Sequence, residues 1–199
     1  MRQHQPDLAK RLAWGGTLTI VAAASSLAVA CGTPFAALAA LGALYLPRRD
    51  AFVLILVNWL VNQTIGFAFL HYPMNWDCYR GGIDIGIAAQ LATLAAMLAH
   101  GPLRSASASV KALASFAAAF ITYEAALFAL SPAGSSADFA AAVVAYIFWV
   151  NAIAFVGLSL LNAAAAALGF VARPGRSAGP GSAVKYPAAV PRGDAGDRP

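Results

Sequence analysis

The chain consists of long apolar runs separated by short polar or turn-forming stretches. Five runs are long enough to cross a bilayer as a helix, because about 20 residues at the helical rise span roughly 30 Å of hydrocarbon. They cover residues 13–30, 51–70, 83–99, 112–130 and 139–172. The pattern predicts an all-α fold, a polytopic integral membrane bundle. The last run, at about 51 Å, is too long for one crossing, and we expect a break near Gly157 or Asn162.

A sixth apolar run, residues 33–47, is shorter. At the helical rise it reaches only about 22 Å, so it must either thin the bilayer locally or lean on neighbouring helices. The basic residues decide whether it crosses, since short cytoplasmic loops carry the positive excess. With six crossings and the N-terminus inside, 12 of the 13 Lys and Arg residues lie inside and Arg80 lies outside, whereas with five crossings four lie inside. The sequence therefore predicts about six transmembrane helices over residues 13–172, with both termini cytoplasmic.

Composition agrees with a membrane protein. The chain is 60% hydrophobic and 11% charged, whereas soluble domains carry about 25% charged residues. Residues 1–12 are predicted to form a basic cytoplasmic N-terminus, and residues 173–199, rich in Pro, Gly and Ala, a disordered cytoplasmic tail. Arg173 and Arg176 favour contact with anionic lipid, which accounts for the net charge of +5 without a nucleic-acid partner.

The start of the chain also resembles a cleaved signal peptide, with a basic stretch, an apolar run and the small residues AVA before Cys31. However, Ala28 stands where the usual lipoprotein box has leucine. The next apolar run starts almost at once and needs a preceding helix with which to return through the membrane, which favours an uncleaved first helix. Cleavage would leave the orientation of the other helices unchanged. Cys31 and Cys78 are both predicted on the outer side, where an oxidising compartment permits a disulfide; the alternative is two buried, unreactive thiols.

Polar side chains interrupt the apolar runs near the middle of the predicted bilayer. Asn58, Asn62 and Gly66 are spaced four apart and form one stripe along a helix, with Gln63 on its shoulder. An unpaired amide in hydrocarbon costs several kcal/mol. The stripe is therefore expected to face the interior of the bundle.

Three further helices carry polar residues at a similar depth. Counting about 1.5 Å per residue places Gln90 and Glu124 near the level of Gln63, and Asn151 near that of Asn58. One interpretation is hydrogen bonds between helices that fix their packing, which suits Asn58 or Asn151 taken alone. The other is a solute site, favoured by Glu124, since an ionisable residue at this depth is a functional hypothesis by default. The predicted ligand-binding residues are Asn62, Gln63, Gln90, Glu124, Asn58, Asn151 and Trp76.

The outer connection HYPMNWDCYRGG, residues 71–82, combines aromatic and charged side chains. In the simpler interpretation Trp76 and its neighbours anchor the membrane interface. The alternative is a lid over the polar layer, with rings that stack on a flat organic ligand. His71, Asp77 and Cys78 fit no defined ligand spacing, and no metal site is predicted.

The stretch GIDIG, residues 82–86, predicts two features of the following helix. Asp84 is placed near the outer start of this helix, where the helix N-terminus favours a carboxylate. Gly82 and Gly86 are four apart, a spacing that lets helix backbones approach closely.

Several catalytic motifs are absent from the sequence: a phosphate-binding loop, a zinc-protease helix, a serine elbow, a haem-attachment motif and a CxxC pair. We therefore expect that the chain is not an enzyme and needs no cofactor. No convincing internal repeat supports an inverted-repeat transporter.

The predicted architecture resembles the substrate-binding membrane subunits of energy-coupling-factor vitamin transporters: six helices in about 20 kDa, cytoplasmic termini, a polar layer and no ATPase motif. Ala24 to Ala28, read as ASSLA, matches the AxxxA pattern with which such subunits dock their energising partner. The resemblance covers residues 13–170. It implies a multi-pass protein of the bacterial inner membrane that binds a small vitamin-like solute and depends on energising transporter subunits. The alternative is a structural or assembly membrane protein without a ligand, whose buried amides serve helix packing.

Overall fold

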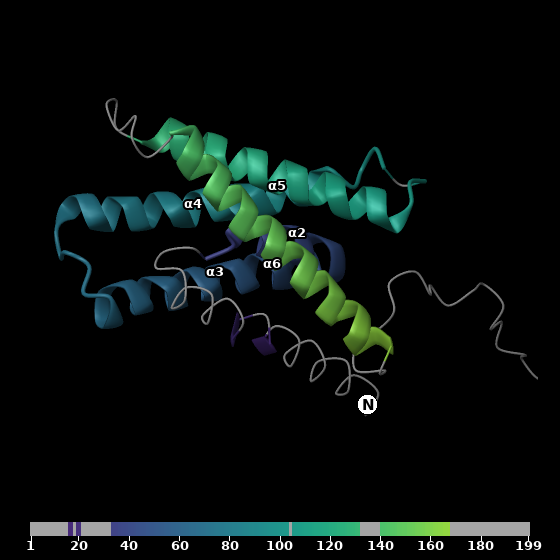
Figure 1. The fold of residues 1–199 in the computed structure, drawn as a ribbon, viewed down its shortest axis with the longest axis horizontal. Helices are drawn as coiled ribbons and strands as arrows, with labels where there is room; N and C mark the ends of the chain where they lie inside the picture. Colours follow the sequence, from purple (N-terminus) through teal and green to yellow (C-terminus); the bar gives the residue numbers. More distant parts are fainter. Residues whose placement is uncertain (1–15, 18, 21–32, 104, 132–139, 168–199) are drawn as a thin grey trace, which may run out of the picture.

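The structure is a computed structural model and describes residues 16–17, 19–20, 33–103, 105–131 and 140–167. Regular secondary structure in these residues is entirely helical, as predicted. The elements are α2 (Phe35–Tyr45), α3 (Arg48–Thr64), the π-helical turn η1 (Ile65–Phe69), α4 (Trp76–Leu98), α5 (Ala108–Leu130) and α6 (Ala141–Ala167) (Figure 1).

Within the described part of the chain, four helices are long and apolar enough to cross a membrane: α3 continued by η1, α4, α5 and α6. Their outward faces carry large exposed apolar side chains, among them Leu60, Ile121 and Ile153. Such a surface suits contact with lipid, where apolar side chains need no cover. The prediction of a helical membrane bundle is confirmed to this extent.

Several predictions concern residues outside the described part of the chain. Most of the first apolar run lies there, so the predicted total of six crossings is not tested. The same holds for the side of the membrane on which the termini lie. The basic N-terminus (1–12), Cys31 with its disulfide, and the tail (173–199) also fall there. All of these stay predictions.

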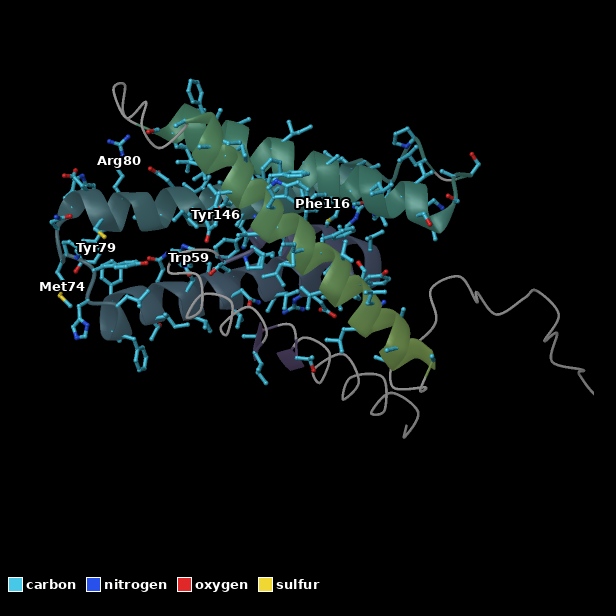
Figure 2. All side chains as sticks on the ribbon, viewed as in Figure 1. Trp59, Met74, Tyr79, Arg80, Phe116 and Tyr146 are labelled. Carbon is cyan, nitrogen blue, oxygen red and sulfur yellow. The ribbon has the colours of Figure 1, made fainter. Side chains whose placement is uncertain are left out.

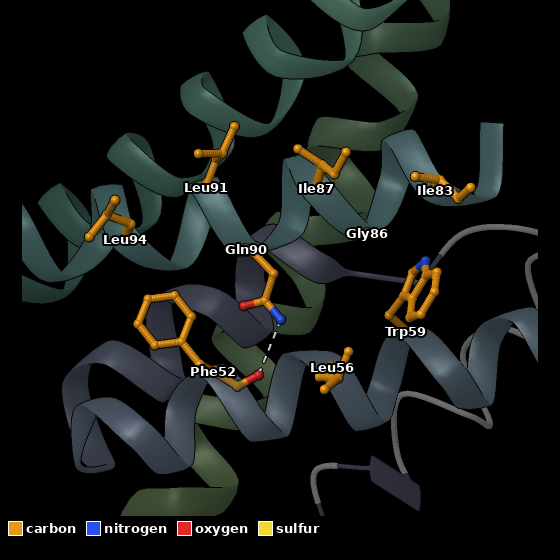
Figure 3. Close-up of a pocket in the computed structure, with 9 residues that line it drawn as sticks. All are labelled: Phe52, Leu56, Trp59, Ile83, Gly86, Ile87, Gln90, Leu91 and Leu94. Atoms are coloured by element: carbon orange, nitrogen blue, oxygen red, sulfur yellow. Dashed lines mark hydrogen bonds between the residues drawn. The ribbon is translucent and has the colours of Figure 1, made fainter. Parts of the chain in front are cut away.

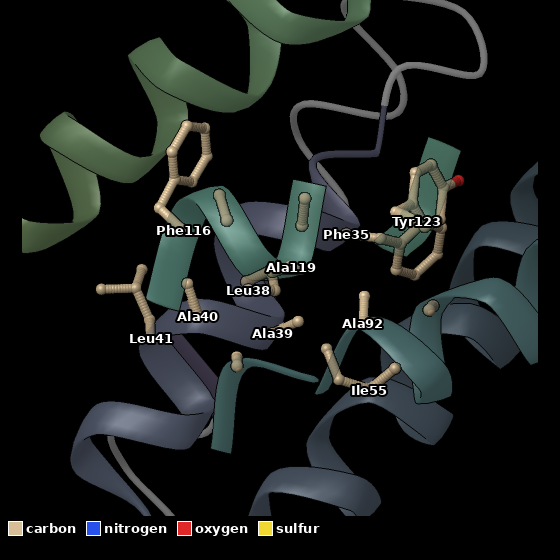
Figure 4. Close-up of a cluster of buried hydrophobic side chains, with 14 of the residues drawn as sticks. Phe35, Leu38, Ala39, Ala40, Leu41, Ile55, Ala92, Phe116, Ala119 and Tyr123 are labelled. Carbon is tan, nitrogen blue, oxygen red and sulfur yellow. The ribbon is translucent and has the colours of Figure 1, made fainter. Parts of the chain in front are cut away.

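The short helix α2 forms the centre of the bundle. Its residues from Phe35 to Gly42 are buried, and it contacts α3, α4, α5 and α6. Figure 4 shows its small and branched side chains packed between Ala92 of α4 and Ala119 of α5. With 11 residues, α2 is only about 16 Å long. Because α2 ends next to the start of α3, it begins about halfway along its neighbours. Of the two predicted alternatives, local thinning of the bilayer and packing on neighbouring helices, the structure shows the packing.

The N-terminal end of α4 differs from the prediction. The helix begins at Trp76 instead of residue 83, since the side chain of Asn75 accepts a hydrogen bond from the Cys78 N–H at 2.9 Å and Asp77 occupies the first turn. The predicted loop 71–82 is therefore wrong in its second half, and a lid made of that stretch is not supported. Asp84 lies two turns inside the helix.

The first turns of α4 are tied to both neighbours. Tyr79 turns toward α3 and stacks on Phe67 with ring centroids 5.0 Å apart (Figure 2). Arg80 donates from Nη2 to the Leu130 carbonyl of α5 at 3.1 Å, and its Nε lies 3.8 Å from Asp84 Oδ2. Asp84 thus pairs along its own helix and does not occupy the first turn.

Helix α6 runs without a break through Gly157 and Asn162 over its 27 residues, about 40 Å. The predicted break at one of these residues is wrong. The alanine-rich sequence after Asn162 favours continued helix, and a single glycine costs only about 1 kcal/mol. Asn151, Phe155, Leu158 and Asn162 form the buried face of the helix.

His100 connects the end of α4 to α5. It follows the last residue of α4, Leu98, as predicted for a helix C-terminus, and its Nε2 lies 2.5 Å from Ser115 Oγ. Burial, and after it the positive charge of Lys111, lowers the pKa of the His100 imidazole below its usual value of 6.5.

Acid is therefore expected to destabilise the protein through His100. Between the lowered pKa of the folded state and 6.5, the unfolded chain binds more protons at this residue, so stability falls as the pH drops below about 6.5. Thermal unfolding in zwitterionic nanodiscs between about pH 8 and pH 5 measures this fall. His100→Gln should flatten the pH profile, and an unchanged slope in the variant would contradict the assignment.

Candidate functional site

Two predicted residues hold the start of α2 inside the bundle. Asn151 of α6 accepts hydrogen bonds at its Oδ1 from the N–H groups of Ala36 and Ala37, at 3.0 and 3.2 Å. Asn62 of α3 accepts one from Thr33 Oγ1 at 2.6 Å. The first N–H groups of a helix have no partner within it, and hydrocarbon offers none. Asn62 and Asn151 therefore stabilise a helix that begins at mid-depth.

Asn58 and Glu124 each have a buried side-chain oxygen that accepts no hydrogen bond in the described structure. Asn58 donates from Nδ2 to the Leu54 carbonyl at 2.8 Å and to Thr19 Oγ1 at 3.3 Å. Glu124 follows Tyr123, whose ring packs on Phe35 at the start of α2 with centroids 6.2 Å apart. One side-chain oxygen of Asn58, of Glu124 and of Gln90 is buried without a hydrogen-bond partner in the described structure.

Gly82 and Gly86 of α4 admit side chains of α3. A Cβ on Gly82 would lie 2.5 Å from Gln63 Oε1, and a Cβ on Gly86 would lie 2.8 Å from Trp59 Nε1. Trp59 Nε1 also donates to the Gly82 carbonyl at 2.7 Å. The sequence predicted close approach of helix backbones at this spacing, whereas the two glycines make room for side chains of α3.

A cavity of about 410 Å³ lies in the same α3–α4 interface (Figure 3). We call it the α3–α4 groove. Trp59 stands at one end and Phe52 near the other, with the aliphatic side chains of α4 along one wall. The residues that line it are Phe52, Leu56, Trp59, Ile83, Gly86, Ile87, Gln90, Leu91 and Leu94.

Gln90 is the polar side chain on the wall of the groove. Its Nε2 donates to the Phe52 carbonyl at 3.2 Å, which fixes the orientation of the carboxamide (Figure 3). Its Oε1 is buried and accepts no hydrogen bond within the described structure. Small-molecule pockets commonly measure about 300–1,000 Å³ and combine apolar walls with a few placed polar groups. The groove has the size and the apolar walls of such a pocket, with the carboxamide residue Gln90 in its lining.

The predicted polar layer is thus divided. Asn62 and Asn151 meet at the start of α2, whereas Gln63 and Gln90 lie in the α3–α4 interface, Gln90 on the groove wall. Glu124 is not among the described residues that line the groove. Trp76 is 72% exposed at the start of α4, as expected for an interface anchor.

Sequence reasoning missed Phe52 and Trp59 as wall residues. The signal was present, because Gly82, Gly86 and Gln90 are spaced four apart and share one face of α4. The carboxamide therefore lies on the face where the glycines bring α3 close.

Comparison with known protein families, curated proteins and solved structures finds no match to the chain. Its class consequently rests on the fold: the four long apolar helices make it a helical membrane protein.

Proposed function

We propose that the chain is the substrate-binding membrane subunit of a small-solute uptake system, with the α3–α4 groove as its binding site. The observation that supports the proposal is the buried, unpartnered Gln90 Oε1 on the wall of a cavity of about 410 Å³. An acceptor left unpaired in an apolar environment costs about 1–3 kcal/mol, and a bound donor would recover this cost.

The proposed topology and energising partners of this subunit are those predicted from the sequence. The chain crosses the bacterial inner membrane six times with both termini in the cytoplasm, and energising transporter subunits drive release of the solute, as in the energy-coupling-factor transporters that the architecture resembles. The solute is small and largely apolar, because the groove wall is formed by aliphatic and aromatic side chains. The rings of Trp59 and Phe52 in the groove lining favour a solute with a flat ring system.

A matched pair of probes tests the groove and Gln90 together. Equilibrium dialysis measures the binding of 2-naphthol and of naphthalene to the protein in zwitterionic nanodiscs, with empty nanodiscs subtracted. One hydrogen bond to Gln90 should make 2-naphthol bind about three to ten times more tightly than naphthalene. In Gln90→Met, which keeps the length of the side chain, this ratio should fall to about one.

Gln63→Met serves as the control, since Gln63 lies in the same interface but is not among the lining residues. It should keep the wild-type ratio. Absence of binding above empty nanodiscs, or the same ratio in Gln90→Met as in the wild type, would contradict the proposed site.

The second candidate is a structural or assembly protein without a ligand. The hydrogen bonds of Asn62 and Asn151 at the start of α2 favour it, because they use predicted ligand-binding amides for packing. In that case probe binding is absent, and Gln90→Met and Gln63→Met leave cellular function intact.

A further inference from the structure

A second cavity lies at one end of the bundle, where the ends of four helices meet. It measures about 480 Å³ and lies between the C-terminal ends of α2 and α4 and the N-terminal ends of α3 and α5. The residues that line it are Ala43, Leu46, Arg48, Met97, Leu98, His100, Gly101 and Lys111. None of them belongs to the α3–α4 groove.

Three of the lining residues are basic or become so on protonation, and they come from three segments: Arg48 from α3, Lys111 from α5, and His100 after α4. Among the described residues on the wall, none carries a carboxylate. The cavity wall therefore includes two positively charged residues and one titratable imidazole.

Two of these charges lie at the N-terminal ends of helices. Arg48 is the first residue of α3, and Lys111 lies in the first turn of α5. The N-terminus of a helix carries partial positive charge and favours anions. Asp50 offsets this in the first turn of α3, but it does not belong to the described cavity wall. Basic side chains and helix N-termini on one cavity wall both favour a bound anion.

Hydrogen bonding orients His100 for the same role. Ser115 donates from Oγ to the Lys111 carbonyl at 2.7 Å, so its oxygen accepts the Nε2–H of His100. The proton of the neutral imidazole is thereby assigned to Nε2, and Nδ1 is the nitrogen that takes up a further proton. A bound anion would favour that uptake and so add a third positive charge.

The rest of the wall is apolar. Leu46, Met97 and Leu98 contribute to it, and Leu98 is 66% exposed beside the cavity. The cavity lies at the ends of helices that are long enough to cross a membrane, which is the depth of lipid headgroups. Positive and apolar walls side by side match a molecule with a phosphate group and an apolar portion.

We propose that this cavity binds the phosphate group of an anionic membrane lipid, with Arg48, His100 and Lys111 around the phosphate and the start of the acyl chains on Leu46, Met97 and Leu98. Basic pockets between membrane helices bind anionic headgroups on the same principle. This lipid site is separate from the proposed solute site and holds whether or not the solute site does.

Short-chain lipids test the site. The protein in a neutral detergent is titrated with dihexanoyl phosphatidylglycerol, with dihexanoyl phosphatidylcholine and with inorganic phosphate, and binding is measured by native mass spectrometry and by the shift in unfolding temperature. Phosphatidylglycerol should bind at least about tenfold more tightly than phosphatidylcholine, and more tightly than inorganic phosphate.

The double variant Arg48→Gln/Lys111→Gln should lower the affinity for phosphatidylglycerol by about ten- to thirtyfold. Arg49→Gln is the matched control, because Arg49 is adjacent and exposed but is not among the described lining residues. It should change the affinity by less than about threefold. The unfolding temperature of each variant without lipid reports that it is folded.

Three results would overturn the proposal. Equal binding of phosphatidylglycerol and phosphatidylcholine would remove the charge recognition. Inorganic phosphate that binds as tightly as the lipid would identify a free phosphate site instead. An Arg49→Gln loss as large as that of the double variant would show general surface attraction and not this cavity.

Discussion

Replacing Asn151 with leucine is expected to lower the free energy of unfolding by about 2–4 kcal/mol. The wild-type side chain is 2% exposed and accepts the N–H groups of Ala36 and Ala37. Leucine has a similar volume but no acceptor, so two donors at the start of α2 would be left unpaired in the membrane interior. Unfolding by sodium dodecyl sulfate in mixed micelles measures the change.

Ile153→Ala provides the comparison on the same helix. Ile153 lies two residues further on and is 70% exposed on the outer face of α6. Its truncation should cost less than about 0.5 kcal/mol. If the Ile153 and Asn151 variants lost equal stability, the hydrogen bonds to α2 would contribute nothing specific.

The second large effect is expected in the α3–α4 groove. Gly86→Leu should abolish measurable binding of 2-naphthol, because even a Cβ at this position would lie 2.8 Å from Trp59 Nε1 and 2.9 Å from its Cε2. The indole ring would have to move into the groove or out of it, and the leucine side chain would occupy part of the remaining space. Equilibrium dialysis in nanodiscs measures the loss.

Gly81→Leu controls for the cost of changing a glycine in α4. A Cβ at Gly81 has no neighbour within 4 Å among the described atoms. This variant should bind the probe as the wild type does and should gain slightly in helix stability. Retained binding in Gly86→Leu would place the probe elsewhere.

The periodicity of the sequence sufficed for the helical class and for four long apolar helices, because length and apolarity are local properties of each run. Helix boundaries depended on single residues. Asn75 caps α4 eight residues before the apolar run begins, so the helix includes Trp76 and the polar turn that follows. Asn75 is a favourable N-cap residue, but the charged residues that follow it, Asp77 and Arg80, are more typical of a loop.

Depth was predictable for the polar residues, but rotation about the helix axis was not. Asn62 and Gln63 are neighbours at almost the same depth, yet Asn62 bonds to Thr33 while Gln63 packs on Gly82. About 100° of rotation separates adjacent residues of a helix. A one-residue step therefore changes which helix a side chain faces.

The role of Asn151 required knowledge of a partner far away in the sequence. It accepts N–H groups of Ala36 and Ala37, 115 and 114 residues earlier. Nothing local to α6 indicates that a short helix begins beside it. By depth alone Asn151 was a ligand-binding candidate. In the structure its carboxamide instead bonds to the start of a helix inside the bundle.

The most direct test of a small-molecule site in the groove is native mass spectrometry of the protein purified from the membranes in which it is produced, with the wild type and Gly86→Leu compared side by side. The wild type should carry a bound small molecule of reproducible mass that is lost in Gly86→Leu and retained in Gly81→Leu. Identical spectra for the wild type and Gly86→Leu, whether both are bare or both carry the same molecule, would contradict a binding site between α3 and α4.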